Sequence, residues 1–219
     1  MIVSLENLEA GIKWWKGGQR NWGADLINSE YKAIFDSKSA GISEEWWAAT
    51  VDRLWNWKAI RAPKPPNTKE AIKTGGTERL NTIAVLFESV RSLIQPEPSI
   101  TDVCWDNIEQ LFKLSCEIKR PNGRLGSPVF ASKMCHFMFP RIFPVIDNLA
   151  TGIFDYEFYW RGMKDEWVRF KQKEEAQAIL KSSIETLEPI HPLYPFETKI
   201  IEISHIGYTH PEESKALAS

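Results

Sequence analysis

Four residues whose side chains can do chemistry lie close together in the second half of the chain: Lys133, Cys135, His136 and Asp147. A lysine amine that burial keeps neutral is a nucleophile, and Lys133 lies among Phe, Met and Cys residues. A carboxylate can direct water onto a carbon and stabilise the positive charge that develops there. Asp147 precedes a predicted helix, whose first N–H groups favour an ionised carboxylate. The segment therefore has residue types suited to nucleophilic or general-base catalysis.

Each of these residues also has an ordinary structural role open to it. Asp is among the best N-cap residues, and Lys133 can pair with Asp147 or hold a phosphate. His136 lies three residues beyond Lys133 on nearly the same helical face, where it can contact a substrate, orient Asp147 or pack in the core. Cys135 and His136 do not form a thiol–imidazole pair, because adjacent helical residues point about 100° apart. We expect a small core residue at Cys135.

The remaining histidines and cysteines indicate neither a metal site nor a redox site. His191, His205 and His210 lack metal-ligand spacing, and the chain has three cysteines without paired spacing. We predict no metal, no cofactor, and reduced, mostly buried thiols. No apolar run approaches the roughly 18 residues that span a bilayer, and the first residues do not read as a leader peptide. We expect a cytoplasmic protein with no membrane partner.

Composition places the chain among ordinary soluble globular proteins. Its 219 residues include 43% hydrophobic and 26% charged residues, which makes disordered, collagen-like and coiled-coil classes poor fits. The net charge of −2 excludes a histone-like protein but leaves room for a local basic face. The ten tryptophans can build a core or a stacking surface for flat ligands.

Helical periodicity dominates and predicts the elements that position the chemical residues. Alternating apolar and polar runs hardly occur, so strands are scarce. In the helix after Ser43, the residues Trp47, Val51, Leu54 and Trp55 fall on one face. Start and stop signals predict helices from Ser4, over about 24–35, from Ser43, from near Thr77, after Thr101–Asp102, from Ser127–Pro128 to before Pro140, after Asp147, over 164–187, and from near Pro195. We expect an all-α domain spanning 1–219, with lobes of about 1–67 and 68–219 joined through a proline-rich loop.

Two windows of the chain are basic, each with a local charge of +4: Lys58 to Arg79, and Glu117 to Arg141. Phosphate contacts supply the sequence-independent part of DNA affinity, and loop glycines in both windows offer backbone N–H groups to phosphate oxygens. The alternative is that both windows are ordinary solvated surfaces.

The most informative stretch is GRLGSPVFASKMCHFMFPRIFPVIDNLATGIF, residues 123–154. It contains a turn with glycines, a helix with Lys133, a turn through two prolines, and Asp147 at the next helix start. This order resembles the helix-hairpin-helix DNA glycosylase superfamily, particularly its bacterial OGG-fold members. The matching positions are Ser132, Lys133, His136, Phe137, Pro140, Phe143, Pro144 and Asp147. The separation of 14 residues between Lys133 and Asp147 is shorter than in the lyase-competent branch of that superfamily.

The resemblance implies a helical DNA-glycosylase-like fold, with two helical lobes flanking a cleft and a hairpin-like element near 118–139. It implies an enzyme that hydrolyses the N-glycosidic bond of a damaged or modified base in double-stranded DNA, in repair or in defence against phage. Asp147 would stabilise the positive charge that develops on the sugar and direct water onto it. Lys133 would either attack the sugar and give lyase activity, or leave a monofunctional enzyme. No obligate protein partner is predicted.

Such an enzyme must extrude a base from the duplex and hold it in a pocket. We expect substrate contacts from His136, Phe137, Trp46, Trp47 and Trp160. We expect DNA contacts from Arg120, Gly123, Arg124, Gly126, Ser127, Lys58, Arg61 and Lys64. The alternative is a non-catalytic helical module that binds DNA or another protein, because fold alone does not decide activity.

Overall fold

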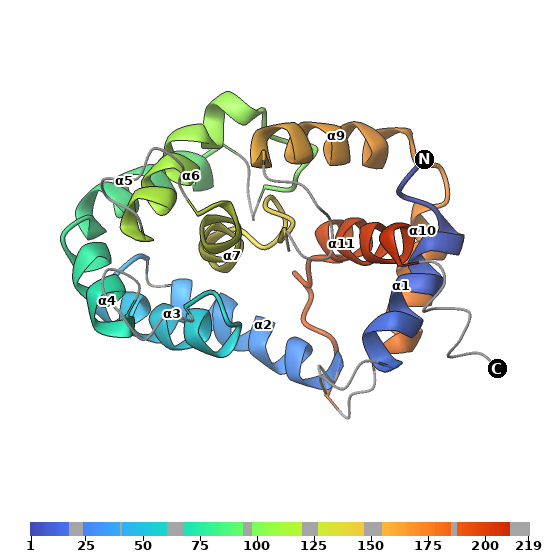
Figure 1. Ribbon diagram of the computed structural model, residues 1–219, viewed down its shortest axis with the longest axis horizontal. Helices are drawn as coiled ribbons and strands as arrows, with labels where there is room; N and C mark the ends of the chain where they lie inside the picture. Colours follow the sequence, from blue (N-terminus) through green and yellow to red (C-terminus); the bar gives the residue numbers. More distant parts are fainter. Residues whose placement is uncertain are drawn as a thin grey trace. The chain divides into compact units, whose positions relative to one another are not determined.

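The structure, a computed structural model, describes residues 1–17, 24–39, 41–60, 68–93, 98–119, 127–146, 155–184 and 188–210. Within these ranges the regular secondary structure is helical and no strand occurs, so the predicted all-α fold class is confirmed. The helices are labelled in Figure 1. They are α1 (Leu5–Gly17), α2 (Ala24–Lys38), α3 (Glu44–Asn56), α4 (Lys69–Thr77), α5 (Leu80–Arg91), α6 (Trp105–Lys119), α7 (Pro128–Met138), α9 (Tyr156–Arg169), α10 (Lys173–Ser183) and α11 (Phe196–Thr209).

The chain divides into two compact units. Unit 1 comprises residues 1–33 and 147–219, and unit 2 comprises residues 34–146. Unit 1 therefore holds α1, α9, α10 and α11, and unit 2 holds α3 to α7. The lobe boundary predicted at about residue 67 lies in the segment 61–67, outside the described residues.

In unit 1, α1 packs along α11 (Figure 1). The two helices meet at glycines. A Cβ atom on Gly11 would overlap the carbonyl oxygen of Ile203, and a Cβ atom on Gly207 would overlap that of Asn7. Both positions therefore require a residue without a side chain, so that the two backbones can approach this closely.

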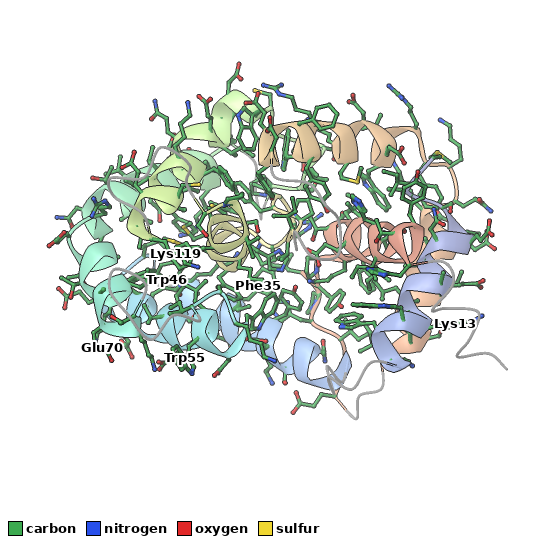
Figure 2. The ribbon with its side chains drawn as sticks, viewed as in Figure 1. Lys13, Phe35, Trp46, Trp55, Glu70 and Lys119 are labelled. Atoms are coloured by element: carbon green, nitrogen blue, oxygen red, sulfur yellow. The ribbon has the colours of Figure 1, made fainter. Side chains whose placement is uncertain are left out.

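In unit 2, α3 begins where the sequence predicted. The hydroxyl of Ser43 accepts a hydrogen bond from the N–H of Trp46 at 3.2 Å, and the two glutamates that follow favour the positive end of the helix. The face prediction for this helix was wrong at one position, because the Trp55 side chain is 47% exposed. Trp46 and Trp55 are nine residues apart, which is two and a half helical turns, so they lie on opposite sides of α3 (Figure 2).

The helix α4 was not predicted. The helix expected to start near Thr77 is α5, which begins at Leu80, and α4 ends at Thr77. The pair Gly75–Gly76 reads as a helix breaker in the sequence. In the structure Gly76 lies within α4, and a Cβ atom there would overlap the indole ring of Trp47, so this position requires a residue without a side chain.

The prediction of one continuous helix over 164–187 was wrong. The structure has two helices here, α9 and α10, separated at residues 170–172. Phe170 has an extended backbone (φ −66°, ψ 124°), and its buried ring contacts that of Trp167 at 5.9 Å between centroids. The chain thus leaves the helix where Phe170 enters the core. The starts of α7 at Pro128 and of α11 at Phe196 agree with their predicted positions.

Candidate active site

The helix α7 carries most of the described residues that resemble a glycosylase site. It packs against α6 and α3 (Figure 1). Ser127 is its N-cap residue and Pro128 its first residue, as predicted. Every residue from Phe130 to Met138 is buried, so its polar side chains must find partners inside unit 2.

Lys133 uses its amine to bind the end of another helix. The side chain is 6% exposed, and Nζ donates a hydrogen bond to the carbonyl oxygen of Trp57 at 2.8 Å. Trp57 is the C-cap residue of α3, whose last carbonyl groups lack partners within the helix. A lysine at that end satisfies a carbonyl and interacts favourably with the helix dipole. Lys133 thus has a structural role that accounts for its burial.

Lys119 binds the same segment and was not singled out as a site residue. Its Nζ donates a hydrogen bond to the carbonyl oxygen of Ala59 at 2.6 Å. Lys119 and Lys133 therefore donate to the carbonyl groups of two residues that lie two positions apart in the chain. The sequence holds a signal for this position. Lys119 follows Phe112 by seven residues and Ser115 by four, which places it on the buried face of α6.

Ser132 and His136 make hydrogen bonds to the segment 143–146, which precedes Asp147 in the sequence. The Nδ1 atom of His136 lies 2.6 Å from the carbonyl oxygen of Phe143, and a carbonyl can only accept, so Nδ1 carries a proton. The N–H of Ile146 donates to the Ser132 hydroxyl at 3.3 Å. Two side chains one helical turn apart therefore hold both ends of segment 143–146. Asp147, the next residue in the sequence, lies outside the described residues.

The residues predicted to contact a substrate are all buried. His136 and Phe137 are fully buried, and Trp46, Trp47 and Trp160 are at most 2% exposed. The Nε1–H of Trp47 donates to the carbonyl oxygen of Lys73 in α4 at 2.8 Å. The described tryptophans serve mainly as core residues, since six of the nine are buried: Trp46, Trp47, Trp57, Trp105, Trp160 and Trp167.

Two of the predicted DNA contacts are described. Ser127 is half-buried at the start of α7, and Lys58 is exposed just after α3. The other predicted DNA contacts lie outside the described residues, as does the glycine-bearing part of the hairpin-like element: Arg61, Lys64, Arg120, Gly123, Arg124 and Gly126.

The cysteines are all free thiols. Cys135 is buried, as predicted, and burial raises the pKa of its thiol far above the usual value. Burial also raises the pKa of Cys116 to about 11. Neither thiol is a thiolate at neutral pH, so neither is an activated nucleophile. Among the described residues, no three His, Cys, Asp or Glu side chains group so that they could hold a metal ion.

Comparisons with family models, curated proteins and solved structures found no match for this chain. A search of the described helices for membrane spans found none that is both long enough and apolar enough.

Proposed function

We propose that this protein is a DNA glycosylase that hydrolyses the N-glycosidic bond of a damaged or modified base. The observation that carries the proposal is the arrangement around α7. The sequence pattern of residues 123–154 resembles that of helix-hairpin-helix glycosylases, and the polar residues of this pattern on α7 each have a defined partner. Ser132 and His136 hold segment 143–146, the stretch that precedes Asp147 in the sequence, against α7.

In this proposal Asp147 is the catalytic carboxylate. As the bond between the base and the sugar C1′ breaks, positive charge develops on the sugar. The carboxylate stabilises that charge and takes a proton from the attacking water. The electron pair of the broken bond leaves with the base, and an abasic site remains in the DNA.

Lys133 is assigned a structural role in this proposal, so that the enzyme is monofunctional. An amine attacks a sugar carbon only with a free lone pair and access to the substrate. The Lys133 amine is buried and donates to the Trp57 carbonyl oxygen. Attack would require that hydrogen bond to break and leave a carbonyl at the end of α3 without this donor.

The test of catalysis is base release from duplexes that carry a panel of modified bases, including hypermodified cytosine. Abasic sites are converted to strand breaks with alkali. We expect breaks with the wild-type protein and none with Asp147→Asn. Asp155→Asn is the matched control, because Asp155 caps α9 by accepting from the N–H of Phe158 at 3.1 Å, and asparagine caps equally well. Equal release by Asp147→Asn and wild type would refute the role of Asp147.

The test of Lys133 is borohydride reduction during the reaction, which traps a Schiff base as a covalent DNA–protein adduct. We expect no adduct with the wild-type protein. An adduct that forms with wild type and disappears in Lys133→Met would show that the lysine attacks, and would contradict the monofunctional assignment.

One observation favours a second candidate, a non-catalytic helical module that binds DNA or a protein. The five described residues expected to contact an extruded base are buried in the structure. This candidate predicts no strand break with any duplex of the panel, together with unchanged DNA or protein binding by Asp147→Asn.

A further inference from the structure

The helix α11 holds a buried ion pair that the proposed function does not use. Nζ of Lys199 lies 2.5 Å from Oε2 of Glu202, three residues further along the helix. The two side chains are only 4% and 11% exposed. Removing two charges from water has a free-energy cost that their attraction often does not offset, so two well-packed apolar residues in their place are frequently as stable or more stable. Stability alone therefore does not explain a buried pair at this position.

Two tyrosines from other parts of unit 1 lie next to this pair. The ring centroid of Tyr31, in α2, lies 5.7 Å from Nζ of Lys199, which is within the range of a cation–π interaction. Tyr194, in the segment that precedes α11, packs edge-on against Tyr31 with 5.2 Å between the ring centroids. Burial raises the pKa of both phenols, and the nearby negative charge of Glu202 raises it further. Both α2 and the segment with Tyr194 thus meet α11 at its charged pair.

Much of the buried surface of α11 is apolar, with Ile200, Ile201 and Ile203 all at most 2% exposed. The hydrophobic effect is non-directional, so isoleucines alone would let the helix rotate or slide against its neighbours with little loss. Toward α1, the close backbone contacts at Gly11 and Gly207 prevent such a shift. Toward α2, the charged pair does so, because a shifted helix would bury its charges against apolar groups, which is costly.

We propose that the Lys199–Glu202 pair selects the packing of α2 and of the segment 188–195 on α11, and that it does so at a cost in stability. A single polar residue at an apolar position of a coiled coil acts in the same way, because it fixes the register of the helices and lowers their stability. This inference goes beyond the proposed function and does not depend on it, since it concerns only how elements of unit 1 pack together.

The test replaces the whole pair and compares the result with the loss of one partner. The double variant Lys199→Met/Glu202→Leu removes both charges and keeps side chains of similar size. We expect its melting temperature to equal or exceed that of the wild type. The single variant Glu202→Leu leaves the Lys199 charge buried without this carboxylate, and its melting temperature should fall by about 6–20 °C.

Hydrogen exchange followed by mass spectrometry measures how firmly the two segments are held. In the double variant, peptides covering residues 28–33 and 188–195 should exchange about 2–150-fold faster than in the wild type, which is the range expected for coupling between residues in contact. Peptides of α10 should keep their wild-type rates. The matched control is Glu157→Leu/Arg161→Met, which removes an exposed ion pair from α9 and should change neither the melting temperature nor the exchange of the two segments.

Faster exchange in both segments, together with an undiminished melting temperature, is the result that supports the proposal. A melting temperature of the double variant below that of the wild type would overturn it, because the pair would then contribute stability. Wild-type exchange rates in both segments of the double variant would also overturn it, because α2 and the segment 188–195 would then pack as firmly without the charges.

Discussion

The close approach of α1 and α11 in unit 1 provides a stability test with an internal control. We predict that Gly11→Ala destabilises the protein, whereas Gly162→Ala stabilises it. Both glycines lie in the interior of helices of unit 1, in α1 and α9. A Cβ atom on Gly11 would overlap the carbonyl oxygen of Ile203 and lie 2.8 Å from its carbonyl carbon. A Cβ atom on Gly162 would have no neighbour within 4 Å.

The magnitude follows from two opposing effects. Alanine is better than glycine inside a helix by roughly 0.5–1 kcal/mol, and both variants gain this. Overpacking a tight contact costs typically about 1–3 kcal/mol, and the cost at Gly11 lies at the upper end because the overlapped atoms belong to the backbone. Gly162→Ala should therefore gain about 0.5–1 kcal/mol and Gly11→Ala should lose about 2 kcal/mol.

The assay is equilibrium unfolding in urea, followed by circular dichroism and tryptophan fluorescence. Both variants replace glycine with alanine, so the effect on the unfolded chain is nearly equal. The difference between their free energies of unfolding therefore reports the contact of α1 with α11 in the native state. Gly207→Ala should resemble Gly11→Ala, because its Cβ would lie 2.6 Å from the Gly11 nitrogen. Equal unfolding midpoints for Gly11→Ala and Gly162→Ala would refute the close packing of α1 on α11.

Three further predictions concern titratable groups. Burial lowers the pKa of His205 to about 4 from a usual 6.5, so the unfolded chain takes up this proton first as the pH falls. The stability that neutral His205 confers is complete above pH 6.5 and is lost between pH 6.5 and 4, by about 3 kcal/mol. Across that range the urea midpoint should fall less in His205→Phe than in the wild type, and an equal fall in both proteins would contradict the lowered pKa of His205. Cys104, which is exposed, should react with a thiol reagent in the native protein, whereas Cys135 should react only after unfolding; equal rates would contradict the burial of Cys135. Lys133→Met should lower the free energy of unfolding by about 1–3 kcal/mol, because the Trp57 carbonyl loses this donor; an unchanged value would refute the capping role.

Local signals in the sequence predicted several helices well. Ser43 followed by two glutamates marked the start of α3, and Ser127–Pro128 marked that of α7. The Ser43 signal is local because its hydroxyl accepts from the N–H of Trp46 in the first turn of α3. Ser127 makes no such bond, and the signal at α7 is Pro128, whose fixed φ and missing N–H suit the first helical position. The break at Phe170 had no such mark, since no glycine or proline lies between α9 and α10. The apolar spacing continues across the break, so periodicity alone indicated one helix.

Contacts between distant parts of the chain could not be predicted from the sequence. Lys133 and Trp57 are 76 residues apart, and no periodicity links a lysine of one helix to the carbonyl end of another. The apolar neighbours of Lys133 did indicate its burial, but they suit a nucleophile and a helix cap equally. The Trp46–Trp47 pair gave the same ambiguity, because a core and a stacking surface use the same residue type. Packing against Gly76 assigns Trp47 to the core.

The most direct measurement is base release by the wild-type protein and by Asp147→Asn on one panel of modified duplexes, with strand breaks counted after alkali treatment. Release by the wild type and by Asp155→Asn, but not by Asp147→Asn, is the expected result. Release that persists in Asp147→Asn would contradict the assignment of the carboxylate, and no release from any duplex by the wild type would contradict the proposed activity itself.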